Sequence, residues 1–299
     1  MRFTAVLLNL LVFSITLQAA PDGPVHSGPY ACTSFAVYSS ETIYGMNFDY
    51  PDVEIRFTLN NSGEHKIFQM EFQHEDGFFV PVAGMNGAGF FSSCQMLLPA
   101  VEQAARVNPE DIYPWELHRE TLLNYSTVGE VVRYLESHQV INGIPTLHNH
   151  LADTLGNAIV VEVDGSLNHI TYHEGDFSIM TNFPNYRFSD VSWQEVEGTG
   201  AERYQIAWQY ITENLADFDV AHGLAALELA RMTGDEWATR CSTVYYPARG
   251  EVHIALQGDF YRTWVVSLAE ETITTGRAFR GVTVWPLGPE GVLAKVLEN

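Results

Sequence analysis

Strand-like and helix-like segments occupy separate blocks along this chain, and this separation constrains the fold more than any other feature. Short runs rich in β-branched and aromatic residues, bounded by glycine, proline and polar turns, predict strands. These runs cover 33–38, 42–48, 55–59, 67–72, 78–82 and 89–95, then 146–151, 158–163, 168–172 and 177–180, and finally 243–246, 251–256 and 263–268. Helix-like segments lie between the blocks instead of alternating with single strands. The pattern favours α+β, with antiparallel sheets covered by helices, over repeated βαβ units.

Start signals support the helical blocks. Pro114 suits the first turn of a helix, because the missing backbone N–H has no partner there anyway. Thr127 followed by Glu130 has the form of a capping box. In the second block, 201–232, Asp219 is a candidate N-cap for a second helix. These signals predict helices that cover the sheets.

The first residues have the pattern of an export signal. Arg2 precedes an apolar run from Ala5 to Leu17, and small residues suited to cleavage follow, so residues 1–19 are predicted to be a signal peptide. Residues 20–31 are rich in proline and glycine and predict a leader or propeptide that is removed. We expect residues 32–299 to form a single domain, secreted or periplasmic. No later run reaches the roughly 18 apolar residues of a spanning helix, so we expect no membrane anchor in the mature form.

The chain is strongly acidic. Its formal net charge of −22 disfavours nucleic acid and anionic membrane surfaces as partners. It is also a reason to doubt strongly anionic substrates.

Three cysteines in an exported chain are an odd number. If Cys32 is the free thiol, Cys94 and Cys241 are either a candidate disulfide pair or two buried unpaired thiols. Cys32 stands out because it lies at the point where the leader ends and strand-like sequence begins.

A cut between Ala31 and Cys32 would place a thiol and a free α-amine on one residue. The α-amine has a pKa of about 7.7–8.0 and a free thiol about 8.5, so the amine can accept the thiol's proton near neutral pH. Nucleophile and base would then belong to the same residue.

Five short motifs follow one another in the chain: Cys32-Thr33-Ser34-Phe35 with Tyr44-Gly45-Met46-Asn47-Phe48-Asp49; Gly84-Met85-Asn86 with Gly89; Leu147-His148 with Asp153, Gly156 and Ile159-Val160-Val161-Glu162; Met180-Thr181-Asn182 with Pro184; and Thr239-Arg240. Their order resembles that of the choloylglycine hydrolase family. This group of N-terminal-nucleophile enzymes includes bile salt hydrolases and penicillin V acylases, with acid ceramidase-like amidases as relatives.

The resemblance implies an α+β fold, a four-layer αββα sandwich of two antiparallel sheets. It implies hydrolysis of the non-peptide linear amide (N-acyl) bond of a small-molecule substrate through a cysteine thioester, without a cofactor or a metal. Matched residue by residue, Cys32 is the nucleophile and Asp49 orients its α-amine. Asn86 and Asn182 donate hydrogen bonds to the oxyanion, and Arg240 lies near the thiol and favours the thiolate.

Met46 departs from the family pattern, which commonly has arginine at this position. Methionine cannot donate a hydrogen bond or stabilise a thiolate, which leaves the substrate class open. Two alternative functions also stay open: an acyltransferase that passes the acyl group from Cys32 to an amine, and a non-catalytic secreted binding domain with the same fold. A papain-like protease would need a Cys-Gly-x-Cys-Trp context, which Cys32-Thr33-Ser34-Phe35 does not provide.

His148 and His150 would share one face of a strand. Two histidines are fewer than the three protein ligands of a typical zinc site, so a metal site is not predicted here.

Overall fold

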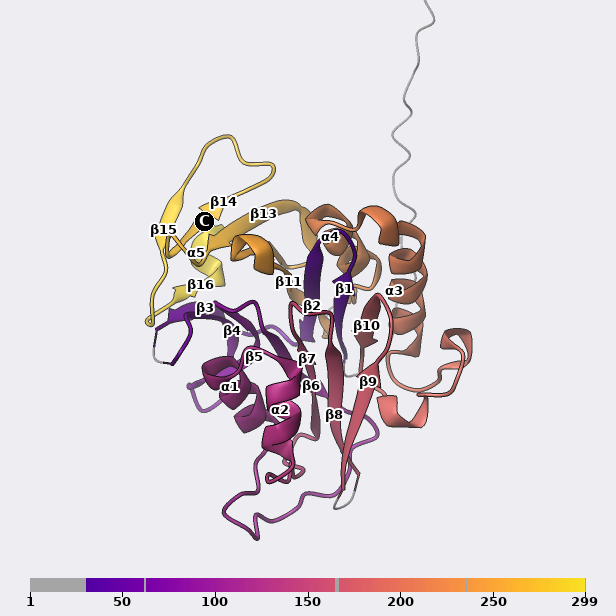
Figure 1. The fold of residues 1–299 in the computed structure, drawn as a ribbon. Helices are drawn as coiled ribbons and strands as arrows, with labels where there is room; N and C mark the ends of the chain where they lie inside the picture. Colours follow the sequence, from indigo (N-terminus) through magenta and orange to yellow (C-terminus); the bar gives the residue numbers. More distant parts are fainter. Residues whose placement is uncertain (1–30, 62, 165–166, 235, 299) are drawn as a thin grey trace, which may run out of the picture.

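The structure, a computed structural model, describes residues 31–61, 63–164, 167–234 and 236–298. The predicted signal peptide at 1–19 lies outside the described residues, as does the predicted leader except for Ala31. Two eight-stranded antiparallel sheets pack face to face, and helices cover their outer faces (Figure 1). The predicted α+β sandwich is confirmed.

The first sheet holds the start of the described chain. Its strands, in spatial order, are β10 (Phe177–Met180), β1 (Ala31–Tyr38), β2 (Thr42–Tyr50), β11 (Ala238–Tyr246), β12 (Glu251–Leu256), β13 (Asp259–Ser267), β14 (Thr272–Thr275) and β15 (Val284–Pro286). Because β1 lies between β10 and β2, its backbone is hydrogen-bonded on both sides.

The second sheet is built mainly from the middle of the chain. Its strands, in spatial order, are β16 (Val292–Leu293), β3 (Ile55–Asn60), β4 (Ile67–Gln73), β5 (Phe79–Asn86), β6 (Phe91–Met96), β7 (Leu147–Ala152), β8 (Ala158–Asp164) and β9 (Leu167–His173). Consecutive strands from β3 to β9 are spatial neighbours, so this sheet is a meander with α1 and α2 inserted between β6 and β7.

Helices complete the two outer layers. They are α1 (Pro114–Asn124) and α2 (Val128–Leu135) on the second sheet, α3 (Ala201–Asn214) and α4 (Val220–Leu229) on the first, and the short α5 (Ala294–Glu298) beside β3 and β16. Short 3-10 turns lie at Asn185–Arg187, Trp193–Glu195, Leu215–Asp217 and Pro247–Arg249. No helix in the described part of the chain has both the length and the apolar character needed to span a membrane.

The predicted helix starts are confirmed. Pro114 is the first residue of α1. At the start of α2, Thr127 Oγ1 accepts from the Glu130 N–H at 3.3 Å, and the Glu130 carboxylate accepts from the Thr127 N–H at 2.9 Å. Asp219 accepts from the His222 N–H at 3.0 Å at the start of α4. These caps satisfy backbone donors that have no partner within the helix.

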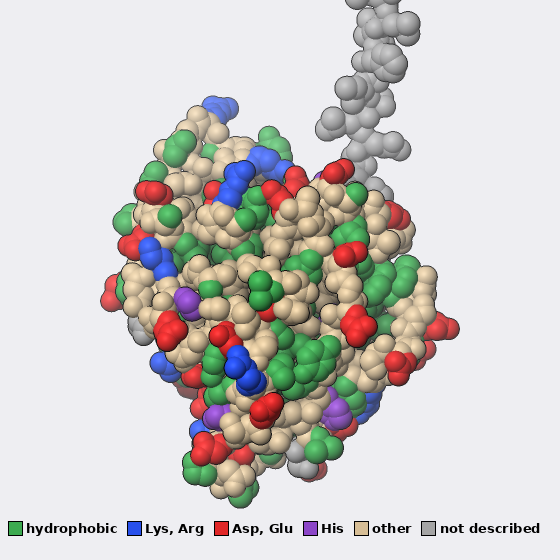
Figure 2. Space-filling view, in the orientation of Figure 1, with side chains coloured by type: hydrophobic (Ala, Val, Ile, Leu, Met, Phe, Trp, Pro, Cys, Tyr) green, Lys and Arg blue, Asp and Glu red, His purple; other side chains and the backbone are tan. Residues whose placement is uncertain are grey.

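Three apolar layers hold the sandwich together. The largest lies between the sheets and includes Phe57, Met70, Phe91 and Trp264, all fully or almost fully buried. The other two layers join each sheet to its helices. Acidic side chains are spread over the visible surface, in keeping with the net charge of −22 (Figure 2).

Gly84 lies where β5 packs closely against β4 and α1. A Cβ atom there would lie 2.5 Å from the Phe68 carbonyl oxygen and 2.8 Å from Leu122 Cδ1. Because the backbone oxygen cannot move aside, we expect Gly84→Ala to lower the free energy of unfolding by about 1–3 kcal/mol. Urea unfolding measures this.

Gly129→Ala in α2 is the matched control, because a Cβ at Gly129 meets nothing within 4 Å. We expect this change to be neutral or to stabilise by about 0.5–1 kcal/mol, from the higher helix propensity of alanine. Equal effects of the two substitutions would contradict the packing argument.

Candidate active site

Cys32 lies near the start of β1, at the end of the first sheet where both neighbouring strands finish. Antiparallel pairing aligns Cys32 with Phe48 near the end of β2, and Ser34 with Met180 at the end of β10. Residues just beyond those two points, Asp49 and Asn182, therefore reach Cys32 from opposite sides. Cys32 is only 6% exposed.

Asn182 contacts the backbone nitrogen of Cys32. Its Oδ1 accepts from the Cys32 N–H at 2.9 Å. Its Nδ2 donates to the Met96 carbonyl at 2.8 Å, which uses one of the two amide hydrogens. The structure thus brings Asn182 to Cys32 as predicted, with the amide oxygen turned toward the Cys32 nitrogen.

Arg203, on the first turn of α3, is the cation next to Cys32. Its guanidinium donates to the Cys32 carbonyl, to Thr33 Oγ1 at 2.8 Å and to Asn182 Oδ1 at 2.7 Å. Nη1 also lies 3.9 Å from Asp49 Oδ2. Arg203 is 2% exposed. A buried arginine with these four neighbours holds the start of β1 against the segment that carries Asn182.

The sequence prediction missed Arg203, although a signal was present. Arg203 lies four residues before Ala207, on the helix face that includes Tyr204 and Ile211 and packs against the sheet. A charged residue on the buried face of an amphipathic helix is rare unless it is paired, so its position alone marks it as a candidate.

Asp49 is buried between Cys32 and β11. Its Oδ1 accepts from Thr239 Oγ1 at 2.5 Å, and Thr239 Oγ1 accepts in turn from the Met232 N–H at 2.8 Å. The backbone N–H of Asp49 is directed at the Cys32 thiol. The strand pair β2–β11 therefore holds the carboxylate in place beside Cys32.

The surroundings of Cys32 keep its thiol protonated. Burial and then the charge of Asp49 raise the pKa of Cys32 to about 12, while the Asp49 N–H and Arg203 act in the opposite direction. Because both of the raising effects disfavour a negative charge on sulfur, the Cys32 thiol is a weak nucleophile in this structure.

Asn86 is not placed at Cys32. Its Nδ2 donates to the Leu122 carbonyl at 3.1 Å and to the Tyr125 carbonyl at 2.8 Å. Its Oδ1 accepts from the N–H groups of Ala88 and Phe90. Both amide hydrogens are thus bound, so the expected donation to an oxyanion is corrected: Asn86 closes the turn after β5 and ties it to the end of α1.

Arg240 is also placed differently from the prediction. It is partly exposed on β11, where Nε donates to the Tyr50 carbonyl at 2.9 Å and Nη1 to Gln257 Oε1 at 3.4 Å. The cation that lowers the Cys32 pKa is Arg203. Met46, at the family's arginine position, is fully buried in the apolar layer between the sheets.

A buried ion pair holds the segment that carries Asn182. His148 Nδ1 lies 2.8 Å from Glu162 Oε1, and Nε2 lies 2.8 Å from the Thr181 carbonyl. The Thr181 carbonyl can only accept, as can an ionised Glu162 carboxylate, so each ring nitrogen is placed to donate one hydrogen bond. Glu162 also accepts from the Asn185 and Tyr186 N–H groups, both at 2.9 Å.

Glu162 is ionised in this pair. Burial opposes its ionisation, but the hydrogen bonds and charge of His148, with the two backbone N–H groups, outweigh that effect and hold the pKa of Glu162 below its usual value. The His148–Glu162 pair thus binds both ends of the short segment around Asn182.

The neighbouring His150 is neutral. Burial holds its pKa well below the usual value. Its ring nitrogens contact Ser34 Oγ at 2.9 Å and Ser178 Oγ at 2.7 Å. The described residues contain no group of three or more histidine, cysteine or acidic side chains arranged to hold a metal ion.

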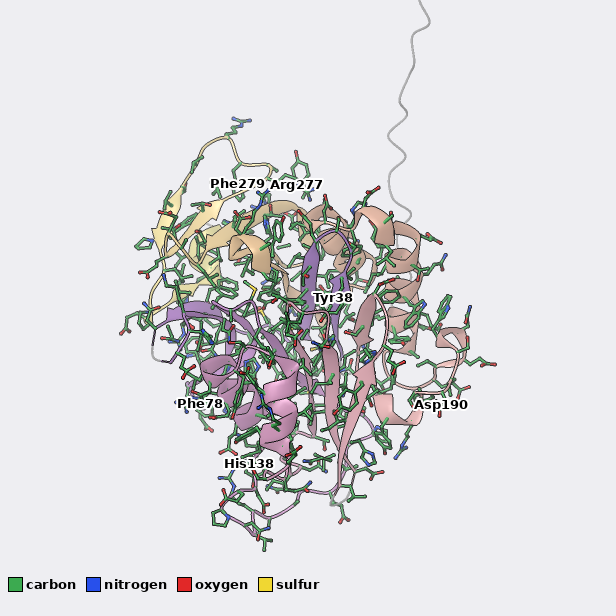
Figure 3. All side chains as sticks on the ribbon, in the orientation of Figure 1. Tyr38, Phe78, His138, Asp190, Arg277 and Phe279 are labelled. Atoms are coloured by element: carbon green, nitrogen blue, oxygen red, sulfur yellow. The ribbon has the colours of Figure 1, made fainter. Side chains whose placement is uncertain are left out.

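A cavity of about 410 Å³ opens at Cys32. Its lining is mostly apolar and aromatic: Cys32, Phe48, Asp49, Tyr50, Phe72, His74, Phe78, Val80, Pro81, Val82, Cys94, Met96, Trp115, Ile144, Pro145 and Leu147. Phe78, half exposed on the β4–β5 hairpin, marks its outer side at the edge of the molecule (Figure 3). No lysine or arginine is among the lining residues.

All three cysteines are free and buried. Cys94 borders the same cavity as Cys32, whereas Cys241 lies on β11 beside Phe48 and Leu256. The candidate Cys94–Cys241 disulfide is therefore wrong, and the alternative of two unpaired buried thiols is confirmed.

Comparison with known proteins shows a match between this chain and one protein family. Residues 67–227, more than half of its length, match the family model for linear amide C–N hydrolases of the choloylglycine hydrolase family. A comparison with curated proteins returned no match.

Among solved structures, two variants of conjugated bile acid hydrolase from Clostridium perfringens are similar, with TM-scores of 0.66 and 0.64 and 15% identity. They cover 86% of this chain and 98% and 97% of their own. Penicillin V acylase from Agrobacterium tumefaciens has a TM-score of 0.63 at 16% identity, over 87% of this chain and 96% of its own. At these identities the likeness concerns the fold.

Arg203→Met should raise the pKa of the Cys32 thiol further, because it removes the cation that favours the thiolate. We expect slower alkylation of Cys32 at any given pH, with the rise in rate displaced to higher pH. We also expect the free energy of unfolding to fall by about 3–5 kcal/mol, since buried Asp49 loses its partner. Iodoacetamide kinetics with peptide mass mapping, and urea unfolding, measure the two effects.

Arg240→Met is the control, and we expect it to change stability by no more than about 0.5 kcal/mol and to leave the alkylation profile in place. The assignment of Arg203 would be overturned by a folded Arg203→Met protein whose profile matches that of the wild type.

Glu162→Gln tests the ion pair that holds the Asn182 segment. The folded-state pKa of Glu162 is lowered, so its ionised form stabilises the fold above the unfolded pKa of about 4.3, and this contribution disappears as pH falls through the folded value. We expect the variant to lose about 3–5 kcal/mol near neutral pH, and the difference from wild type to shrink on acidification. Urea unfolding across pH measures this.

The exposed Glu290→Gln serves as its control and should leave the free energy of unfolding within about 0.5 kcal/mol of wild type. A constant difference between Glu162→Gln and wild type down to strongly acidic pH would contradict an ionised Glu162.

Proposed function

The chain belongs to the choloylglycine hydrolase family of linear amide C–N hydrolases, and we propose that it cleaves N-acyl amides with Cys32 as the N-terminal nucleophile of a processed chain. The single observation that carries this proposal is the position of the Cys32 nitrogen. This nitrogen lies 2.9 Å from Asn182 Oδ1, and the thiol of Cys32 itself borders the apolar cavity. Asp49 and Arg203 complete the polar surroundings.

Removal of residues 1–31 would convert this nitrogen into an α-amine with a pKa of about 7.7–8.0. We propose that residues 1–19 are an export signal, that residues 20–31 are a leader, and that the enzyme is secreted or periplasmic. The new ammonium lies next to the thiol and lowers the thiol pKa from the value of the uncut chain. Asp49 and Asn182 are the acceptors that orient it.

The reaction has two halves. In the first, the α-amine takes the thiol proton, the thiolate attacks the amide carbon, and the ammonium returns the proton to the leaving nitrogen as the C–N bond breaks. A Cys32 thioester and a free amine result. In the second, the α-amine takes a proton from water, whose oxygen attacks the thioester. The acid is released and the proton returns to sulfur.

Two groups support the tetrahedral intermediate. Asn182 Nδ2 has a second hydrogen beyond the one bound by Met96, and it is our candidate donor to the oxyanion. Arg203 acts through its neighbours: it holds the Cys32 carbonyl and Asn182 Oδ1, and its charge offsets that of Asp49. We regard it as a positioning residue.

The two halves of the substrate lie on different sides of Cys32. The leaving nitrogen must receive its proton from the α-amine, so the amine half lies toward Asn182 and Arg203. The acyl half then faces the cavity lined by Phe48, Phe72 and other apolar side chains. Because no lysine or arginine lines that cavity, we propose that the acyl group of the substrate is neutral and apolar.

The direct test follows the N-terminus and the thioester. We expect N-terminal sequencing of the mature protein to begin at Cys32, and intact mass to show an acyl adduct on Cys32 during turnover. Cys32→Ala should lower kcat/KM at least about a thousandfold, because it removes the nucleophile. Cys241→Ala, remote from the cavity, should keep turnover.

Two results would contradict this mechanism. One is full activity in a chain that still carries residues 20–31, since the α-amine is then locked in a peptide bond. The other is an adduct on Cys94 instead of Cys32. Adding an amine acceptor separates hydrolysis from acyl transfer, because both pass through the same thioester and differ only in the product.

A further inference from the structure

A second cavity of about 420 Å³ adjoins the one at Cys32. Its lining comes from the segment after β6 and from the segment before β7: Met96, Leu97, Leu98, Ala100, Val101, Glu102, Gln103, Gly143, Ile144, Pro145 and Thr146. The two cavities share Met96, Ile144 and Pro145, so these three side chains form the boundary between them.

Hydrogen bonds give this second cavity a built wall. The Leu97 N–H donates to the Thr146 carbonyl at 3.0 Å, and the Ala104 N–H donates to the Asn142 carbonyl at 3.0 Å. Thr146 Oγ1 accepts from the Val101 N–H at 3.1 Å and donates to the Val101 carbonyl at 3.2 Å. With these backbone groups bound to each other, the surface left for an occupant is mostly side-chain carbon.

The chemistry of the residues between the two cavities indicates which kind of ligand covers them. Ile144 is 77% exposed although it lies between two mostly apolar cavities. Met96 is unbranched and can change rotamer to let a flexible group pass. Glu102 is the charged residue of the second lining, and no lysine or arginine is among its members, so an anionic occupant is disfavoured.

We propose that this second cavity binds the distal part of a long, unbranched, neutral acyl chain whose carbonyl carbon lies at Cys32. This inference rests on the proposed function and deepens it. The acyl half of the substrate already faces the first cavity, and a flexible chain that continues past Met96 and Pro145 buries Ile144. A rigid ring system confined to the first cavity leaves the second cavity empty. The enzyme is therefore an amidase for long-chain N-acyl amides.

The test is a chain-length series on the processed enzyme. Butanoyl, octanoyl and dodecanoyl para-nitroanilides are used below their critical micelle concentrations. We expect kcat/KM to rise by roughly fourfold per added methylene, the factor that corresponds to burial of one CH₂ group. The increase should continue from octanoyl to dodecanoyl, because the second cavity receives the end of the longer chain.

Val101→Trp is the blocking variant, since Val101 lines the second cavity and not the first. We expect it to lower the dodecanoyl-to-butanoyl ratio of kcat/KM at least about tenfold. Val107→Trp is the matched control: it lies on the same segment, is 82% exposed and borders neither cavity, so the ratio should stay at the wild-type value. If Val101→Trp does not fold, Gln103→Trp at an exposed lining position replaces it.

The outcomes separate the two proposals. A wild-type ratio near one, or equal ratios in the blocking and control variants, overturns the long-chain inference, while turnover of the butanoyl substrate still supports the proposed amidase. Absence of turnover with every amide in the series, in protein shown to begin at Cys32, overturns the proposed function itself.

Discussion

Antiparallel pairing around β1 is the constraint on which the site depends. A strand that begins between two antiparallel neighbours begins where both of them end. Asp49 near the end of β2 and Asn182 just after β10 are therefore delivered to Cys32 by sheet geometry, although they are distant in sequence. A slip of one residue in either pairing would turn Cys32 to the opposite face of the sheet, away from the cavity. The apolar layer between the sheets opposes such a slip.

Charge balance is the second requirement. A region that is almost closed to solvent holds three polar groups that are costly to bury: Asp49, Arg203 and the thiol of Cys32. Arg203 offsets the Asp49 charge from 3.9 Å and directs its remaining donors at oxygen atoms of the β1 start and of Asn182. The cation beside Cys32 thus comes from α3. At the position on β2 where the family commonly has arginine, this chain has Met46, which is buried in the apolar layer between the sheets.

The parts of this structure that the sequence predicted are those set by local patterns. Strand runs and helix caps such as Thr127 and Asp219 depend on neighbours a few residues away, and they are in place. The strands after residue 270 were missed because they have two to four residues each, too few to show alternation. The positions of Asn86 and Arg240 depended on long-range contacts. In sequence, a polar residue beside a glycine turn fits the closing of that turn as well as it fits donation to an oxyanion. At Asn86 the local hydrogen bonds take up both amide hydrogens.

The segment around Asn182 connects Cys32 to the walls of the two cavities. Asn182 Nδ2 donates to the Met96 carbonyl at 2.8 Å, and the Asn182 carbonyl accepts from the Leu98 N–H at 2.7 Å. Met96 and Leu98 line the cavities, so the cavity wall is hydrogen-bonded directly to the residue that contacts the Cys32 nitrogen. His148 holds the same segment from β7. Asn182 is thus a link between the two sheets, and the alignment of Cys32 depends on their packing as much as on the residues that touch it.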